Sequence, residues 1–461
     1  MESDQEIIII GCGAGGGTAA QFARKTNRKV KITIFEKEQY PQYSKCGLPY
    51  AISKDIPSFN DLIEFSKEWF NKNNIDLQLN TKIEKINPEK QIINIKKENK
   101  TFEKKYDKLI IATGAKPSVP NIENIFSDKQ LISGINYIHT INDAKQITNT
   151  IKQEKKAVII GAGLIGLEIA DVFYNKKLKV ILIEALPSIL PNTFDEDIAE
   201  TIQNTIPDKI KIYTNHTLTK IKHKNKTITQ VIIYNNETKQ KQTIDTDILL
   251  IATGTKPNTT LAKQAEIKIG KTGGIIVNEK TQTSQKNIYA VGDCTEYKDF
   301  ITQKPTLIGL GSIAVRQGIA AGTNAAGQNY QLPKGVLQTR TSHFFNKEIA
   351  AVGPTTKQLK ETPIVLGKIK GSTLPDYYPG GQSITIKLIA HKNTGQILAA
   401  QALGPNAAQR INTIACAILN KMTIEKFRKL ETAYAPPIAP TLDVITLVCD
   451  IIAKKISHFK R

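Results

Sequence analysis

One cysteine of this sequence occupies a position from which a thiol could do chemistry. Cys46 lies in the stretch of residues 43–50, where Gly47 and Pro49 predict a turn that presents the side chain. Ala51 stands five residues further on, and no second cysteine is near in the sequence. Any redox reaction at Cys46 should therefore use a single sulfur, in its thiolate form. An inert small residue at a turn is the structural alternative.

A glycine-rich turn precedes this stretch. Residues 6–10 are apolar and mostly isoleucine, which predicts a buried parallel strand. Gly11, Gly13 and Gly16 follow as G-x-G-x-x-G, and a helical pattern then runs to about Lys25. In this motif the first glycine permits a tight turn, the second lets the backbone approach a diphosphate, and the third lets helix and strand pack closely. The next predicted strand, residues 30–35, ends at Glu36, which could bind ribose hydroxyls. Together these features predict a dinucleotide site.

The same pattern occurs a second time. A strand at residues 157–160 leads into Gly161, Gly163 and Gly166, a helix follows, and a strand at residues 180–183 ends at Glu184. Two copies predict two dinucleotides, one a bound redox cofactor and the other an exchangeable nicotinamide coenzyme. Glu184 would repel a 2′-phosphate, which favours NADH over NADPH. Three lysines close to it leave NADPH open, namely Lys176, Lys177 and Lys179.

Three further segments are strands that stop at small turns. Residues 109–114 and 249–254 are near copies that end in Ala-Thr-Gly, and each is followed by a Lys-Pro pair. They suit crossings between two nucleotide-binding domains, where the backbone must lie close to a cofactor. Residues 288–293 form a strand ending in Gly-Asp, and Asp293 could accept a hydrogen bond from a ribityl hydroxyl.

The composition is that of an ordinary globular protein with a large excess of positive charge. The chain has 461 residues, enough for about three domains, and 40% of them are hydrophobic. No apolar run reaches the length of a membrane helix, and five scattered cysteines do not form a disulfide framework, so we expect a cytoplasmic protein. The net charge of +21 comes from dispersed lysines without a nucleic-acid-binding motif. We therefore expect no nucleic-acid or membrane partner, although the charge could attract anionic substrates.

The order of these motifs resembles the FAD-dependent pyridine nucleotide-disulfide oxidoreductases, over essentially the whole chain. Because it has a single cysteine at this position, the chain resembles one branch of that family in particular. This branch contains coenzyme A-disulfide reductases, NADH oxidases and NADH peroxidases. The resemblance implies an α/β fold with two Rossmann-like dinucleotide-binding domains, as in glutathione reductase, and a C-terminal α+β dimerisation domain. The expected boundaries are 1–118 and 253–330 for FAD, 119–252 for NAD(H) and 331–461 for dimerisation.

The C-terminal third also carries this resemblance. Tyr377, Tyr378, Arg410 and the Tyr-Ala-Pro-Pro motif that begins at Tyr434 are similar to the dimerisation domain of that branch. Residues 383–390 and 396–403 predict a pair of strands, whereas residues 407–419 and 424–430 predict helices. The resemblance implies a homodimer in which Tyr434 points toward the partner's flavin. It also gives Tyr377, Tyr378 and Tyr434 a catalytic role beside Cys46, since a phenol can donate a hydrogen bond to a leaving thiolate.

The resemblance further implies which residues bind the two cofactors, FAD and NAD(P)H. For FAD they are Gly11, Gly13, Ala14, Gly15, Gly16, Glu36, Lys37, Ser44, Ala112, Thr113, Gly114, Asp293, Gly311 and Ala314. For the nicotinamide coenzyme and the crossing beside it they are Gly161, Gly163, Leu164, Ile165, Gly166, Glu168, Glu184 and Gly254.

The expected reaction passes hydride from NAD(P)H through flavin to Cys46. Ala14 stands where peroxidases and many oxidases of the branch have a histidine, which favours coenzyme A disulfide or a related disulfide or persulfide as the acceptor. Thr18, Lys25 and Lys45 fall at positions that contact the thiol substrate in relatives, although Lys45 replaces an asparagine and Lys25 an arginine. Reduction of oxygen or peroxide through a cysteine sulfenic acid is one alternative. A flavin-binding electron carrier without disulfide chemistry is another.

The remaining candidates are assigned structural roles. His139 occupies what is often an arginine in the family. The other cysteines are expected to be packing residues, because no metal-ligand spacing links them, and no metal is expected. These cysteines are Cys12, Cys294, Cys416 and Cys449.

Overall fold

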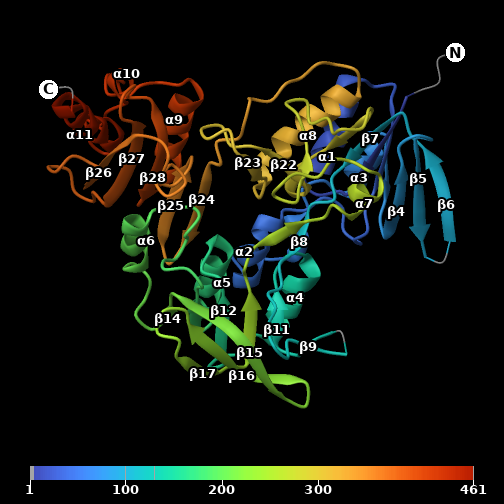
Figure 1. Cartoon of the computed structure of the whole chain (residues 1–461), viewed down its shortest axis with the longest axis horizontal. Coiled ribbons are helices and arrows are strands. Elements are labelled where there is room, and N and C mark those ends of the chain that lie inside the picture. The colour runs from blue at the N-terminus through green and yellow to red at the C-terminus, as the bar shows by residue number, and fades with distance from the viewer. Residues whose placement is uncertain (1–4, 99, 129, 460–461) are drawn as a thin grey trace. The chain divides into compact units, whose positions relative to one another are not determined.

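The computed structural model describes residues 5–98, 100–128 and 130–459 (Figure 1). The chain divides into two compact units. Unit 1 comprises residues 1–118, 137–149 and 254–336, and unit 2 comprises residues 119–136, 150–253 and 337–461. Each unit contains a parallel sheet in which one strand, β1 or β12, leads into one of the two glycine turns.

A five-stranded parallel sheet forms the centre of unit 1, with the strand order β21-β7-β1-β2-β3. Its strands are β1 (Glu6–Ile10), β2 (Lys31–Phe35), β3 (Ile75–Gln78), β7 (Lys108–Ile111) and β21 (Ile288–Ala290). Because β1 lies between β2 and β7, the order of the strands reverses beside the first glycine turn. Ligands of open α/β sheets bind at such a reversal, beyond the carboxyl ends of the strands.

Two helices that cover this sheet approach each other closely. They are α1 (Ala14–Thr26) and α8 (Gly311–Ala325). A Cβ atom at Gly318 would lie 2.5 Å from the Gly15 carbonyl oxygen, and one at Gly322 would lie 2.1 Å from that of Ala19. Only glycines allow this contact, which places the beginning of α8 beside the first glycine turn.

Smaller elements complete unit 1. An antiparallel sheet beside β2 contains β4 (Thr81–Asn87), β5 (Ile92–Lys97) and β6 (Lys100–Lys105), and it buries Ile83, Ile86, Ile93 and Ile95 (Figure 1). The other elements are a 3₁₀ helix at Lys45–Gly47, α2 (Leu48–Ser53), a 3₁₀ helix at Phe59–Leu62, α3 (Lys67–Lys72), β8 (Ala115–Pro117), α4 (Ile141–Thr150), β19 (Thr255–Pro257), α7 (Thr260–Gln264), β20 (Ile275–Ile276), a 3₁₀ helix at Gly292–Cys294, β22 (Thr295–Lys298) and β23 (Pro305–Leu307).

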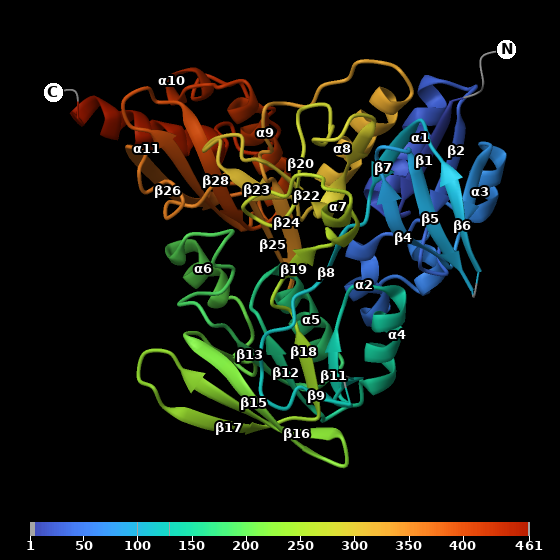
Figure 2. The same ribbon diagram turned by 45° about the vertical axis from the view of Figure 1, so that its right-hand side comes forward.

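Unit 2 repeats the parallel architecture, with the strand order β11-β18-β12-β13-β14. Its strands are β11 (Ile135–Tyr137), β12 (Lys156–Ile160), β13 (Lys179–Ile183), β14 (Lys211–Tyr213) and β18 (Ile248–Ile251), and α5 (Leu164–Asn175) follows β12. Figure 2 shows a second, antiparallel sheet next to it. That sheet contains β15 (His216–Lys224), β16 (Thr227–Asn235) and β17 (Lys241–Asp245), and a hairpin of β9 (Phe126–Ser127) and β10 (Gln130–Leu131) lies in the same unit.

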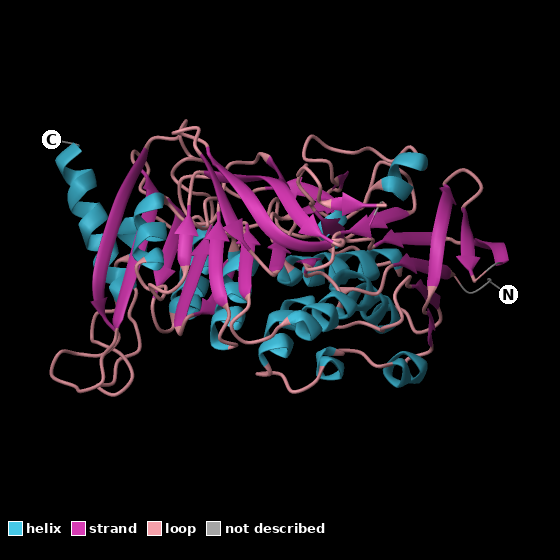
Figure 3. Ribbon diagram, turned by 90° about the horizontal axis from the view of Figure 1, so that it is seen from below, coloured by secondary structure: helices cyan, strands magenta, loops and turns pink. Residues whose placement is uncertain are grey.

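The C-terminal part of unit 2 is an antiparallel sheet with the strand order β24-β25-β28-β27-β26. Its elements are β24 (Arg340–Phe344), β25 (Lys347–Val352), β26 (Ile364–Ser372), β27 (Ser383–His391) and β28 (Ile397–Leu403), with the helices α6 (Glu196–Gln203), α9 (Ala407–Leu419), α10 (Ile424–Phe427) and α11 (Val444–Phe459). Figure 3 shows the C-terminal helix, α11, beside long strands of this sheet. The predicted strand pair is confirmed, whereas the helix expected at residues 424–430 ends at Phe427.

The fold class predicted from the sequence is confirmed, with two parallel α/β layers and a C-terminal α+β region. Among the described residues, no helix combines the length and the apolar character that crossing a membrane requires. The same part of the chain contains no group of three or more His, Cys, Asp or Glu side chains that could hold a metal ion.

Candidate active site

The first glycine turn has the geometry that its sequence predicted. Gly11 has a φ of +104°, and a Cβ atom there would lie 2.3 Å from the Ala112 carbonyl oxygen. At Gly16 a Cβ atom would lie 2.0 Å from the carbonyl oxygen of Gly11. Gly13, which caps α1, is different, because a Cβ atom there would meet nothing within 4 Å. The turn therefore leaves open space in front of the helix N-terminus, where a diphosphate would meet free N–H groups.

Glu36 holds this turn in place from the end of β2. Its Oε2 accepts a hydrogen bond of 2.6 Å from the backbone N–H of Cys12, and its Oε1 accepts one of 2.9 Å from that of Glu38. The carboxylate therefore lies beside the turn, where its remaining lone pairs can face a ribose.

The second turn repeats this geometry in unit 2. Gly161 has a φ of +97°, and a Cβ atom at Gly166 would lie 1.9 Å from its carbonyl oxygen. Gly163 caps α5 and again faces open space. Glu184 accepts hydrogen bonds from Ala162 at 2.8 Å and Leu186 at 3.0 Å, both through their backbone N–H groups. Both turns thus fit a dinucleotide, because each offers a helix N-terminus, room for phosphates and an acid for a ribose.

Asp293 lies at the same edge of the unit 1 sheet as the first turn. It follows β21 in a 3₁₀ helix, and burial raises its pKa to about 6, although the charge of Lys45 partly offsets this effect. Among the described residues we find no hydrogen-bond donor for this carboxylate. A buried carboxylate with spare acceptor capacity fits a ribityl hydroxyl, since burial without a partner is costly.

The Ala-Thr-Gly segment at residues 112–114 connects β7 to β8. The strand β7 pairs with β21, which leads to Asp293. The Thr113 hydroxyl donates to the Asn258 carbonyl oxygen at 2.7 Å, and the Asn258 amide donates back to the Thr113 carbonyl oxygen at 3.0 Å. Gly114, with a φ of +62°, faces open space, as does Gly254 with a φ of +89°. These bonds fix the two crossing segments against each other and leave backbone accessible where each one turns.

Cys46 is exposed and lies against the beginning of α8. A Cβ atom at Gly311, the first residue of that helix, would be 3.9 Å from the Cys46 Sγ. The N-terminal end of a helix favours negative charge, so it stabilises a thiolate. The other cysteines of unit 1, Cys12 and Cys294, are buried, and burial raises the pKa of both thiols. Among the cysteines of unit 1, Cys46 is therefore the one that a solute can reach.

Glu168 stands in the second helical turn of α5 and has a partner on β24. Burial raises its pKa, and the Ser342 hydroxyl opposes this by donating to Oε1 at 2.6 Å. Leu164 and Ile165 form the first turn of the same helix, and the side chain of Ile165 is exposed. The structure thus places these three predicted coenzyme contacts on one helical segment.

The predicted catalytic tyrosines meet in the C-terminal part of unit 2. The hydroxyls of Tyr377 and Tyr434 lie 2.6 Å apart, which raises the pKa of Tyr377. Both side chains are exposed, as is that of Tyr378. Their phenol groups are thus available to a ligand or to another chain.

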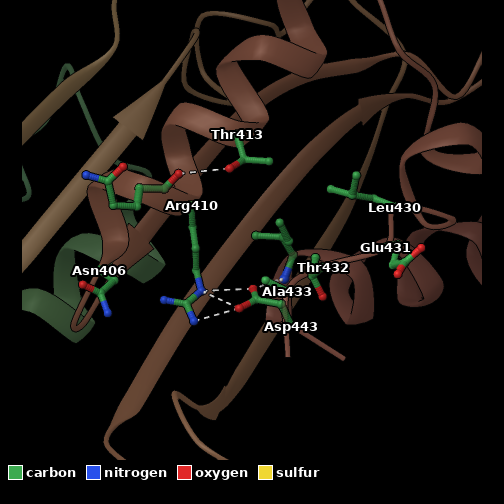
Figure 4. A pocket seen from close by; sticks show the side chains of 10 residues that line it. Asn406, Arg410, Thr413, Leu430, Glu431, Thr432, Ala433 and Asp443 are labelled. Atoms are coloured by element: carbon green, nitrogen blue, oxygen red, sulfur yellow. Dashed lines mark hydrogen bonds and ion pairs between the residues drawn. The ribbon is translucent and has the colours of Figure 1, made fainter. Parts of the chain in front are cut away.

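A pocket of about 410 Å³ lies next to the segment that carries Tyr434 (Figure 4). Within it the Arg410 guanidinium binds both carboxylate oxygens of Asp443, at distances of 2.8 to 3.1 Å. Leu430 and Ala433 line the same pocket. The ion pair therefore joins α9 to the residue that precedes α11 and fixes the end of the segment that bears the tyrosine.

Comparison with known proteins decides the family. A family model described as "Pyridine nucleotide-disulphide oxidoreductase" matches residues 5–324, and the corresponding dimerisation domain matches residues 339–444. The chain belongs to the pyridine nucleotide-disulphide oxidoreductases. It is accordingly an FAD-dependent NAD(P)H oxidoreductase, and the two glycine turns fit the two cofactors that the family uses.

Individual members of this oxidoreductase family match the chain over nearly its full length. An NADH oxidase from Methanocaldococcus jannaschii is 38% identical over 98% of this chain and 99% of its own length. An NAD(P)H sulfur oxidoreductase (CoA-dependent) from Pyrococcus furiosus is 33% identical, over 97% and 99% respectively. The solved structure of an NAD-dependent persulfide reductase from A. fulgidus has a TM-score of 0.92 at 31% identity, covering 98% of this chain and 84% of that one.

The structure also places the other predicted site residues of this oxidoreductase. Thr18 is buried between α1 and α8, where a Cβ atom at Gly318 would be 3.0 Å from its own Cβ. Lys25 is exposed at the end of α1, with its ammonium 4.7 Å from the centre of the Phe22 ring. Ala314 is buried in α8, and Ser44 donates its backbone N–H to Leu62. Their roles toward a substrate or FAD stay predictions.

The structure also corrects one expectation. Cys416 was expected to pack in the interior, but its side chain is exposed on α9. His139 is predicted to be structural, and its Nε2 lies 3.2 Å from the Lys45 ammonium, so that role stays a prediction. Sequence analysis also missed Ser342 as a partner of Glu168, because nothing in the sequence near either residue points to the other.

Proposed function

We propose that this oxidoreductase uses NADH to reduce coenzyme A disulfide, or a related coenzyme A persulfide or polysulfide, through Cys46. The observation that carries the proposal is the exposed Cys46 Sγ against the beginning of α8, in the unit that holds the first glycine turn and Asp293. The name of the 33% identical sulfur oxidoreductase, which is CoA-dependent, supports the same substrate class.

The overall reaction balances with one hydride and one proton. NADH, a proton and a disulfide R–S–S–R give NAD⁺ and two thiols R–SH. When bound, FAD would supply the relay that carries the electron pair of the hydride to sulfur. The Cys46 thiolate attacks one sulfur of the substrate and forms a mixed disulfide, and the other sulfur leaves as a thiolate. The electron pair then cleaves the mixed disulfide, which releases the second thiol and regenerates Cys46.

The proposal assigns a role to each part of the chain. Residues 1–118 and 253–330 bind FAD, residues 119–252 bind NADH, and residues 331–461 join two copies. A homodimer lets Tyr377, Tyr378 and Tyr434 serve as proton donors to the leaving thiolate, with Tyr434 directed to the partner's flavin. Glu168 accompanies the nicotinamide at the beginning of α5. Thr18 and Lys25 contact the coenzyme A part of the substrate.

Glu184 supports NADH as the reductant. Both of its carboxylate oxygens accept backbone hydrogen bonds, so the acid is fixed at the end of β13. A 2′-phosphate at this position would meet a negative charge. The ratio of kcat/KM for NADH and NADPH tests this part, and a preference for NADPH would contradict it.

An NADH oxidase is the second candidate function. The 38% identical relative from M. jannaschii carries that name. In this reaction Cys46 would pass through a sulfenic acid while oxygen or peroxide is reduced. Ala14 in the first glycine turn disfavours the oxidase function, because oxidases and peroxidases of the branch often carry a histidine there.

One experiment separates the two functions. Turnover of NADH is measured side by side with coenzyme A disulfide, polysulfide, hydrogen peroxide and oxygen, in wild type and in Cys416→Ser as a control for the exposed cysteine of unit 2. We expect kcat/KM for coenzyme A disulfide or polysulfide to exceed that for oxygen by at least about tenfold, a difference of ~1.4 kcal/mol in transition-state binding. A higher value for oxygen would establish the oxidase instead.

A further inference from the structure

Lys45 is adjacent to the reactive cysteine, but its side chain turns toward the nucleotide side of unit 1. The ammonium lies 3.2 Å from the Nε2 of His139 and 3.8 Å from Oε1 of Glu38. It also lies 5.9 Å from the centre of the Tyr43 ring. None of these partners belongs to the residues expected to contact the disulfide substrate.

The groups around this ammonium are connected to three of the five strands of the parallel sheet. Glu38 follows β2, Asp293 follows β21 and feels the charge of Lys45, and His139 is hydrogen-bonded to the backbone of Ala115, which follows β7. The strand β1 lies between β2 and β7 and ends in the first glycine turn. Lys45 therefore reaches over the carboxyl edge of the sheet, at the position where such folds bind the phosphates of a dinucleotide.

His139 holds the ammonium there as a neutral acceptor. Burial together with the charges of Lys45 and Lys37 lowers the pKa of His139 to about 4, so the ring is uncharged near neutral pH. A neutral imidazole can accept a hydrogen bond on one nitrogen, here Nε2. Its backbone is fixed as well, because the N–H of His139 donates to Asp143 Oδ2 at 3.1 Å.

The negative groups near Lys45 do not occupy all of its hydrogen-bond donors, so its ammonium can bind a further anion. Glu38 already accepts a hydrogen bond of 2.9 Å from the Tyr43 hydroxyl, and its distance of 3.8 Å from the ammonium is too long for a direct hydrogen bond. An ammonium has three donors, of which His139 takes one. The Lys45 side chain is 40% exposed, so the other donors are accessible.

We propose that Lys45 binds the diphosphate of FAD, with His139 as its positioning residue, and that Lys45 is a cofactor contact instead of a substrate contact. The site combines the N–H groups at the beginning of α1, the space beside Gly13 and this ammonium. A charge-assisted bond to a diphosphate is among the stronger polar contacts in proteins. The proposal rests on FAD binding and does not depend on which acceptor the enzyme reduces.

Release of FAD from the holoenzyme tests it. Wild type and variants are diluted, and the return of flavin fluorescence is followed without any substrate. Lys45→Asn should release FAD about tenfold faster, as expected for the loss of one charge-assisted hydrogen bond. Lys45→Arg keeps the charge and should stay close to wild type. Lys85→Asn is the matched control, because it removes another exposed lysine from the same unit, on β4, and should leave the release rate unchanged.

The role of His139 has its own comparison. His139→Leu removes the acceptor and should speed FAD release, whereas His139→Gln restores an acceptor oxygen and should recover slow release. Faster release in Lys45→Asn supports the proposal whatever the KM for the disulfide does. An unchanged release rate in Lys45→Asn, with or without a raised KM, overturns it and returns Lys45 to the substrate site. Because no turnover is measured, this failure is distinct from a failure of the proposed disulfide reduction.

Discussion

Cys46 has no accessible sulfur beside it within unit 1, since Cys12 and Cys294 are buried. We therefore predict that Cys46→Ser keeps FAD and accepts hydride from NADH, because both glycine turns are unchanged. It should lose disulfide reduction almost completely, since a hydroxyl cannot form the mixed disulfide. Anaerobic titration with NADH should also show a long-wavelength thiolate–flavin absorbance in wild type that the variant lacks. Full disulfide turnover by the variant would place the chemistry at another residue.

Ser342 binds the carboxyl of Glu168, the residue that we propose accompanies the nicotinamide. Its hydrogen bond stabilises the carboxylate and so opposes the effect of burial on the pKa. Ser342→Ala should raise the pKa of Glu168 further, so the ionised form should appear only at higher pH. We expect the pH profile of flavin reduction by NADH to shift upward by up to about one unit, measured by stopped flow. Ser342→Thr keeps the hydroxyl and should restore the wild-type profile, while an unshifted profile in Ser342→Ala would separate Glu168 from this step.

At the scale of the elements, the functions of the two glycine turns should be separable by adding one methyl group to one turn at a time. An alanine at Gly13 or Gly163 meets no protein atom within 4 Å, so neither change should disturb folding. Each methyl would instead occupy the space for phosphates. Gly13→Ala should lose most of its FAD, whereas Gly163→Ala should stay yellow and show a raised KM for NADH. Flavin absorbance and NADH kinetics on both variants check this, and a Gly163→Ala protein without flavin would reverse the assignment.

A buried ion pair connects α6 to the C-terminal sheet. The Lys387 ammonium lies 2.8 Å from Asp195 Oδ2 and 2.6 Å from Asp197 Oδ1. Burial lowers its pKa, but the hydrogen bonds to the two aspartates outweigh this and raise it. Breaking such a pair leaves an uncompensated charge, so Lys387→Met should cost about 3–5 kcal/mol of unfolding free energy.

The control for this prediction lies on the neighbouring strand. Lys368 contacts the same Asp197 at 3.1 Å, but that pair is largely exposed. Lys368→Met should therefore change the free energy of unfolding by less than about 1 kcal/mol. Denaturant titration followed by fluorescence compares the two variants. Equal losses would show that burial does not distinguish the two contacts.

For the whole molecule, the exposed apolar side chains of the C-terminal region indicate a covered surface. Tyr377, Ile438 and Leu442 are 69%, 74% and 59% exposed. Large exposed apolar side chains gathered on one segment are typical of protein interfaces. We predict a homodimer, and the double variant Ile438→Asp with Leu442→Asp should sediment as a monomer that keeps FAD. Because Tyr434 lies on the same segment, this monomer should lose disulfide turnover. An active monomer would contradict the shared site.

Local chemistry explains which features could be predicted from the sequence. The glycine turns, the strands before them and Glu36 and Glu184 lie within short stretches, so their spacing alone predicts the geometry. Pairs of side chains that only folding brings together could not be predicted from the spacing of residues in the sequence. Lys45 and His139 are 94 residues apart, and Ser342 and Glu168 are 174 residues apart. The three-domain boundaries and the roles of the tyrosines likewise stay predictions, because they depend on bound cofactors and a second chain.

The isolation of Cys46 has a consequence for the lifetime of the enzyme in air. A cysteine with a neighbouring thiol can return from its first oxidised state by closing a disulfide, but the other cysteines of the same unit, Cys12 and Cys294, are buried. Further oxidation to the sulfinic and sulfonic acids is then unopposed, and neither is reversed by ordinary thiols. Loss of activity during aerobic storage should therefore be permanent and should follow the gain of two or three oxygen atoms on the peptide that contains Cys46. A bound thiol cap, such as a mixed disulfide with coenzyme A, would preserve the sulfur for later reduction.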